Sequence, residues 1–185
     1  MNVVAVGDSI TEGFPNLVPY TTSLSLDRHW APVSISNLGT SGETMQTMLA
    51  NYSTSAAPLY KPGYKNILIL EGCSNDLAGG TSPSTCYGYI NSYVADAHAT
   101  GYTILVWTVL SKVGIDSQKD TLNTSIVANS AGADGIVNFT STPLGCDGCY
   151  TNTTWFQADG IHPNQAGIDT YEAPVNSTEI NTVTP

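Results

Sequence analysis

Short apolar runs alternate with longer segments of mixed polarity along this chain. The apolar runs are rich in Val, Ile and Leu, and Gly, Pro and Asn bound them, which is typical of buried strands. We predict five strands, over residues 3–6, 33–38, 67–70, 103–107 and 135–139. The run at 67–70 is the most apolar of them and indicates a central strand covered on both faces.

The segments between these strands carry the start and stop residues of helices. Pro19 suits a first helical turn, and Gly101 and Gly132 follow the ends of two other segments. We predict helices over residues 19–30, 43–52, 85–100 and 116–131, and a last one after Pro163. Because strands and helices alternate, we expect a three-layer α/β fold, with helices on both faces of a five-stranded parallel sheet.

The chain reads as one domain over residues 1–185, without internal repeats, low-complexity tracts or linkers. This length is sufficient for a hydrophobic core. Residues 140–158 form a predicted loop whose length favours a functional role. The polar residues from Pro174 onward are expected to fray.

Charge excludes several classes of partner. Charged residues make up only 11% of the chain and the formal net charge is −10. Five Lys and Arg residues cannot form a phosphate-binding stripe, so neither nucleic acid nor an anionic membrane is an expected partner. No apolar run is long enough to span a bilayer. We see no phosphate loop and no dinucleotide fingerprint, and we expect no cofactor.

The four cysteines are Cys73, Cys86, Cys146 and Cys149, an even count that allows three pairings. We prefer two structural disulfides, Cys73–Cys86 and Cys146–Cys149. The pair 146–149 is also spaced as a redox motif or half a zinc site. However, it lies in a Gly- and Pro-rich loop, and 73 and 86 are too far apart to supply a second close pair. We therefore expect no metal.

Disulfides also bear on localisation. Met1 directly precedes the first strand with no leader, which fits either a cytosolic protein or a mature exported protein with an added Met. Because disulfides persist in oxidising compartments, the cysteines favour a secreted or periplasmic protein.

Candidate chemistry lies at the two ends of the chain. Ser9 follows Gly7 and Asp8 where the first strand ends, and ligands bind at the carboxyl ends of strands in open α/β sheets. Asp159 and His162, near the other end, supply a base and a group to orient it. Taken alone, Gly-Asp-Ser is a common turn and Asp-x-x-His a capping pair or half a metal site. Together they form a Ser-His-Asp set.

At these residues the sequence resembles the GDSL, or SGNH, hydrolase family. The four blocks of that family match Ser9, Gly42, Asn75, and Asp159 with His162, in the same order and over nearly the whole chain. The resemblance implies a flavodoxin-like fold and a serine esterase. It implies Ser9 as nucleophile, His162 as base and Asp159 as its partner. It also implies an oxyanion hole made by the backbone N–H groups of Ser9 and Gly42 and the side-chain amide of Asn75.

The third block departs from the usual Gly-x-Asn-Asp of this family. Here Gly72 lies three residues before Asn75 instead of two, and Cys73 takes the expected glycine position. A Cys73–Cys86 bridge would brace this altered turn. We interpret Asp76, and Asp8 beside the nucleophile, as structural.

The chain is too short for a lid or a large cap, which favours an open, shallow site for acetyl or short acyl esters. The resemblance equally allows a carbohydrate acetylesterase, a lipase or lysophospholipase, or a thioesterase. Trp155 and Phe156 precede Asp159 and either line the acyl or sugar site or belong to the core.

A different class remains open: a non-catalytic carbohydrate- or ligand-binding protein that retains the fold. The altered third block favours it, and the complete Ser-His-Asp set opposes it. His29 and His98 lie near predicted helix ends, where a cation is stabilising, and have no ligand-spaced partner. We expect a monomer acting on a small-molecule, carbohydrate or lipid ester.

Overall fold

A computed structural model of the chain describes residues 1–26 and 33–184. Its centre is a five-stranded sheet in the order β2-β1-β3-β4-β5, with every neighbouring pair parallel. The strands are β1 (Asn2–Gly7), β2 (Ser34–Gly39), β3 (Asn66–Leu70), β4 (Thr103–Trp107) and β5 (Gly135–Val137). The predicted α/β fold with five parallel strands is confirmed.

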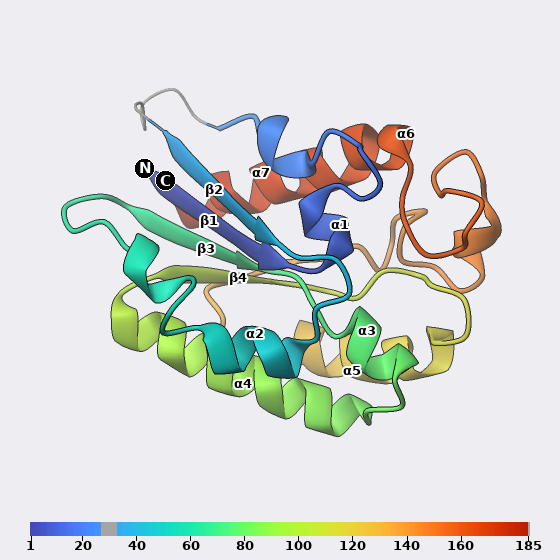
Figure 1. The fold of residues 1–185 in the computed structure, drawn as a ribbon, viewed down its shortest axis with the longest axis horizontal. Coiled ribbons are helices and arrows are strands. Elements are labelled where there is room, and N and C mark those ends of the chain that lie inside the picture. Colours follow the sequence, from blue (N-terminus) through green and yellow to red (C-terminus); the bar gives the residue numbers. More distant parts are fainter. Residues whose placement is uncertain (27–32, 185) are drawn as a thin grey trace.

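Helices cover both faces of the sheet (Figure 1). One face carries α2 (Met45–Asn51), α3 (Ser74–Ala78), α4 (Pro83–Thr100) and α5 (Asp116–Ala128). The other carries α1 (Ser9–Glu12), α6 (Gln165–Gly167) and α7 (Ala173–Val183). The two layers follow from strand geometry, since successive side chains point to opposite faces. Thus Val4 and Leu68 belong to the core under α4, whereas Val3 and Ile67 belong to the core under α7.

The predicted helix over 19–30 is wrong in its described part. Only a 3₁₀ turn forms, η1 (Tyr20–Thr22), and residues 24–26 have no regular structure. Pro19 is its only start signal, and no side chain caps the turn. Trp30 and His29, placed at the end of this helix, lie outside the described residues.

The carboxyl-terminal segment is more ordered than its polarity predicts. Gln165–Gly167 leads into a π-helical turn, η5 (Ile168–Glu172), and then into α7. Ile180 is fully buried, and the buried side chain of Asn176 accepts a hydrogen bond from Trp107 Nε1 at 2.8 Å. The expected fraying after Pro174 is therefore wrong, because these polar groups find partners in the core.

The long loop between β5 and α6 contains two short elements besides its turns, η4 (Cys149–Thr151) and a β-bridge between Phe156 and Pro163. It also contains the Cys146–Cys149 disulfide, as predicted. The remaining short 3₁₀ helix of the described chain is η3 (Ala57–Leu59). None of the helices described is long and apolar enough to cross a membrane.

Candidate active site

Ser9 is the first residue of α1, which follows β1 at the carboxyl edge of the sheet. The Asp8 carboxylate caps this turn by accepting the Ile10 N–H at 2.9 Å. Gly7 permits the close packing beneath it, since a Cβ there would overlap Thr11 Oγ1 and Glu71 Oε2. Ser9 itself is 6% exposed. The nucleophile candidate is thus largely buried at the start of a capped helical turn.

The fold brings the two distant sequence motifs together. Ser9 Oγ lies 2.8 Å from His162 Nε2, although 153 residues separate them. His162 Nδ1 lies 2.7 Å from Asp159 Oδ2. An ionised carboxylate only accepts, so Nδ1 donates to Asp159 and Nε2 is left to accept from the Ser9 hydroxyl. This is the geometry that general-base activation of a serine requires.

The turn between Asp159 and His162 explains their spacing. Asp159 Oδ1 accepts the backbone N–H groups of Ile161 at 2.9 Å and His162 at 3.1 Å, which leaves Oδ2 for the ring. Gly160 has φ +67°, a left-handed conformation that favours glycine. Partial burial acts to raise the pKa of Asp159, but the hydrogen bonds from His162 and Ile161 outweigh it and leave that pKa below its ordinary value.

The oxyanion-hole candidates differ in whether their N–H groups already donate to an acceptor within the protein. Gly42 lies in the loop after β2 with φ +78° and open space beside it. Across the part of the chain that the structure describes, the N–H groups of Ser9 and Gly42 have no intramolecular acceptor. Asn75, in contrast, is fully bonded: Nδ2 donates to Asp8 Oδ2 at 3.1 Å and to the Glu43 carbonyl at 3.0 Å. The two backbone donors are therefore open to solvent or substrate.

The altered third block forms a compact local structure. Cys73 adopts φ +73°, and α3 starts at the next residue, so the extra residue is absorbed in one left-handed turn. Asp76 Oδ2 accepts the Met45 N–H at 2.7 Å and joins α3 to α2, which agrees with its structural interpretation. Asp8 does more than cap its turn, because it also holds Asn75.

The predicted Cys73–Cys86 disulfide is wrong: both residues are buried free thiols. Their sulfur atoms and an Asp76 carboxylate oxygen all lie within 4.8 Å of one another, which is a grouping able to hold a metal ion. Burial raises the pKa of the Cys73 thiol well above its ordinary value, and hydrogen bonding with Cys86 raises it further. The raised pKa favours the neutral thiol form of Cys73.

The sequence did not predict two charged residues that lie beside the site. Lys112 follows β4, and its Nζ donates to Asn75 Oδ1 at 3.2 Å. Glu71 follows β3 and accepts the Asp8 N–H at 2.9 Å and the Thr11 hydroxyl at 3.1 Å. Burial, followed by the nearby charge of Asp8, raises the pKa of Glu71 well above its usual value. Glu71 directly follows the predicted strand 67–70, which was an available signal, whereas Lys112 lies five residues after the predicted strand 103–107.

Trp155 and Phe156 were expected either to line the site or to belong to the core. Phe156 is 1% exposed and belongs to the core, and the partly buried Trp155 packs edge-on against Tyr171. Phe14 takes the position beside the site instead: it is 42% exposed and its ring centroid is 5.1 Å from that of His162.

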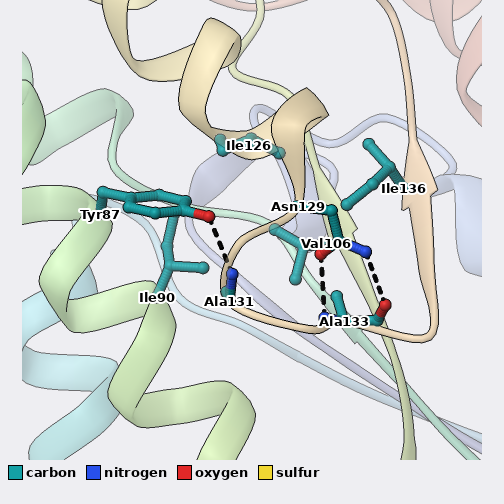
Figure 2. A pocket seen from close by; sticks show the side chains of 8 residues that line it. All are labelled: Tyr87, Ile90, Val106, Ile126, Asn129, Ala131, Ala133 and Ile136. Atoms are coloured by element: carbon teal, nitrogen blue, oxygen red, sulfur yellow. Dashed lines mark hydrogen bonds between the residues drawn. The ribbon is translucent and has the colours of Figure 1, made fainter.

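Two hollows are lined by residues that contact His162, Phe14 in one and Asp159 in the other. One, of about 300 Å³, is formed by the segment 12–17, which includes Phe14. The other, of about 250 Å³, is formed by Asp159, Tyr150 and their neighbours in the long loop. A separate apolar hollow between α4 and α5 is lined by residues such as Tyr87, Ile90 and Ile126 and contains none of the candidate residues (Figure 2).

A family model described as the GDSL-like Lipase/Acylhydrolase family matches residues 5–169. The chain belongs to this family. Membership makes this acylhydrolase a carboxylic ester hydrolase. No curated protein matches the chain.

Solved structures resemble this acylhydrolase in fold. A member of the lipolytic protein G-D-S-L family from Veillonella parvula DSM 2008 has a TM-score of 0.71 at 21% identity, covering 95% of each chain. The psychrotrophic esterase EstA from Pseudoalteromonas sp. has a TM-score of 0.73 at 15% identity, over 98% of this chain and 97% of its own. The acetyl xylan esterase AlAXEase has a TM-score of 0.75 at 14% identity, over 96% of this chain and 98% of its own.

Proposed function

We propose that this acylhydrolase cleaves short-chain acyl or acetyl esters through a covalent acyl-enzyme formed on Ser9. The observation that carries the proposal is the continuous hydrogen-bonded series from Ser9 Oγ through His162 to Asp159, at 2.8 and 2.7 Å. A binding module has no need of this series, and the non-catalytic alternative is correspondingly disfavoured.

His162 takes the Ser9 proton on Nε2 as Oγ attacks the ester carbonyl carbon. The imidazolium formed is stabilised by Asp159, whose lowered pKa keeps it ionised. His162 then returns the proton to the leaving alcohol as the acyl-enzyme forms. Water attacks the acyl-enzyme by the same route in reverse, which releases the acid and restores Ser9.

The oxyanion that develops in each step needs donors aimed at it. The unpaired N–H groups of Ser9 and Gly42 are the principal donors in this proposal. Asn75 contributes when one of its side-chain N–H groups, which otherwise donates to Asp8 or to the Glu43 carbonyl, also donates to the oxyanion. Removing one such donor typically costs about 2.7–4 kcal/mol of transition-state stabilisation.

The site favours small acyl groups. Phe14 lies beside His162 and offers an apolar surface, but the hollows lined by Phe14 and by Asp159 are only about 300 and 250 Å³. A carbohydrate acetylesterase is the second candidate, because Tyr150, Thr153 and Gln157 line one hollow with groups that bond sugar hydroxyls. Lysophospholipase and thioesterase activities stand as further alternatives within the family.

Hydrolysis of p-nitrophenyl acetate, butyrate and octanoate by the wild type and by Ser9→Ala tests the function. We expect turnover of the acetate by the wild type, weaker turnover of the octanoate, and none above background in the variant. Equal activity of both proteins would exclude Ser9 as the nucleophile, and a preference for the octanoate would favour a lipase.

We also propose that the protein is exported and monomeric. The Cys146–Cys149 disulfide supports an oxidising compartment. Mass spectrometry after thiol alkylation of protein from the native host should find this bridge formed, and sedimentation should give a mass near 19.5 kDa.

A further inference from the structure

Lys112 lies in a loop whose backbone is fixed on both sides. The preceding residue, Ser111, donates its N–H to the Leu144 carbonyl at 2.8 Å, and Val113 donates to the Gly160 carbonyl at 3.0 Å. The second bond joins the lysine loop to the turn that holds Asp159 and His162. Lys112 is only 7% exposed. The position of its side chain is therefore determined by the packing around the loop, with little contact with solvent.

The ammonium group determines the orientation of Asn75. A lysine only donates, so the Asn75 atom that faces Nζ at 3.2 Å must be the carbonyl oxygen. On the other side, the Glu43 carbonyl only accepts and therefore requires the amide nitrogen. Rotation of the amide by half a turn would break both contacts. Consequently the N–H groups stay on the side of Asp8 and the Ser9 turn.

The charge on Lys112 also affects the strength of that donor. A cation at the carbonyl oxygen draws electron density from the amide and makes its N–H groups better donors, as in other hydrogen-bonded series. Three nearby acidic side chains act electrostatically on the ammonium group: Asp8, Glu71 and Asp159. Burial lowers the pKa of Lys112, and these carboxyl groups oppose that effect without cancelling it.

We propose that Lys112 is a positioning residue for ester hydrolysis, which acts by holding and polarising the Asn75 amide for the oxyanion. The proposal rests on the proposed function. It assigns no contact between Lys112 and the substrate. Lys112 should therefore affect kcat and leave KM nearly unchanged, and its effect should vanish when Asn75 is absent.

A double-mutant cycle with p-nitrophenyl acetate tests this coupling. The proteins are the wild type, Lys112→Met, Asn75→Ala and the double variant. Complete loss of an oxyanion donor lowers kcat about 10²–10³-fold, and we expect Lys112→Met to lower it about tenfold with KM within twofold. In the Asn75→Ala background the same change should alter kcat less than twofold.

Two controls separate positioning from loss of charge or fold. Lys112→Arg keeps the cation and should recover part of kcat. Lys65→Met removes a half-buried lysine directly before β3, at the opposite edge of the sheet, and should retain wild-type kcat.

In the wild type, kcat should fall at alkaline pH as Lys112 loses its proton, and this fall should be absent in Lys112→Met. Independent effects of the two substitutions, or an unchanged kcat in Lys112→Met, would overturn the proposal.

A second readout does not depend on hydrolysis. The side-chain amide NMR signals of Asn75, assigned by their loss in Asn75→Ala, should shift as Lys112 titrates in the wild type and remain fixed in Lys112→Met. Signals that do not respond in the wild type refute the contact, whatever the activity. Responding signals in a protein that cleaves no ester would overturn the proposed function while the contact itself stands.

Discussion

Glu172 gives this protein a specific dependence of stability on pH. It ends the π-helical turn before α7, its side chain is fully buried, and neither carboxyl oxygen has a hydrogen-bond partner among the described residues. Burial, with a smaller contribution from the charge of Asp8, raises the pKa of Glu172 from 4.5 to about 8. The folded protein thus keeps a proton that the unfolded chain releases.

The size of the effect follows from the two pKa values. Well below pH 4.5 Glu172 is protonated in both the folded and the unfolded state, so it does not make the free energy of unfolding depend on pH. As pH rises from 4.5 to 8, the unfolded chain gains the free energy of ionisation and the folded protein does not. Since one pKa unit corresponds to about 1.4 kcal/mol, stability falls by about 4–5 kcal/mol over this interval. That loss is a large fraction of the total stability of a typical domain.

Urea unfolding of the wild type and of Glu172→Gln at pH 4.5, 6 and 8 measures this loss. The amide cannot ionise, so the free energy of unfolding of the variant should lack the decrease with pH that Glu172 causes. A buried amide without partners costs about 1–3 kcal/mol, so the variant should be equal or less stable at pH 4.5 and more stable at pH 8. Glu12→Gln, an exposed carboxylate on α1, is the control and should follow the wild type. If the free energy of unfolding changed with pH in the same way for Glu172→Gln and the wild type, the reasoning would be refuted.

Three further outcomes are expected. Ser9→Ala and His162→Ala should each lower kcat by at least about 10³-fold, and Asp159→Asn by less, in the p-nitrophenyl acetate assay. Asn176→Ala, which removes the buried partner of the Trp107 indole, should cost about 1–3 kcal/mol in urea unfolding, and a loss below about 0.5 kcal/mol would contradict that assignment. Reduction of the Cys146–Cys149 bridge should cost about 2 kcal/mol, because it closes only a short loop, and a drop above about 4 kcal/mol in urea unfolding would show a larger role.

The hydrophobic pattern was sufficient to predict the sheet. Alternation within the strands places Val3 and Val4 on opposite faces, and this periodicity depends only on local geometry. The prediction failed for residues 19–26, where a single Pro19 signal had no periodic apolar face behind it. It also failed at Asn176, whose polarity conceals a buried hydrogen bond.

The composition of the candidate site was also available from the sequence. Ser9, Asp159 and His162 belong to short motifs whose chemistry depends on residue type and spacing, and the strand order brings the ends of β1 and the last loop together.

The contacts around that site were decided by tertiary packing alone. Lys112 and Asn75 meet across 37 residues, and no local pattern marks that pairing. The even number of cysteines predicted two disulfides, and only the packing leaves Cys73 and Cys86 as thiols while Cys146 and Cys149 are bridged. Charge states such as that of Glu172 depend on burial, which exists only once the chain has packed. Local chemistry therefore identified the candidate residues, and packing decided their neighbours, orientation and ionisation.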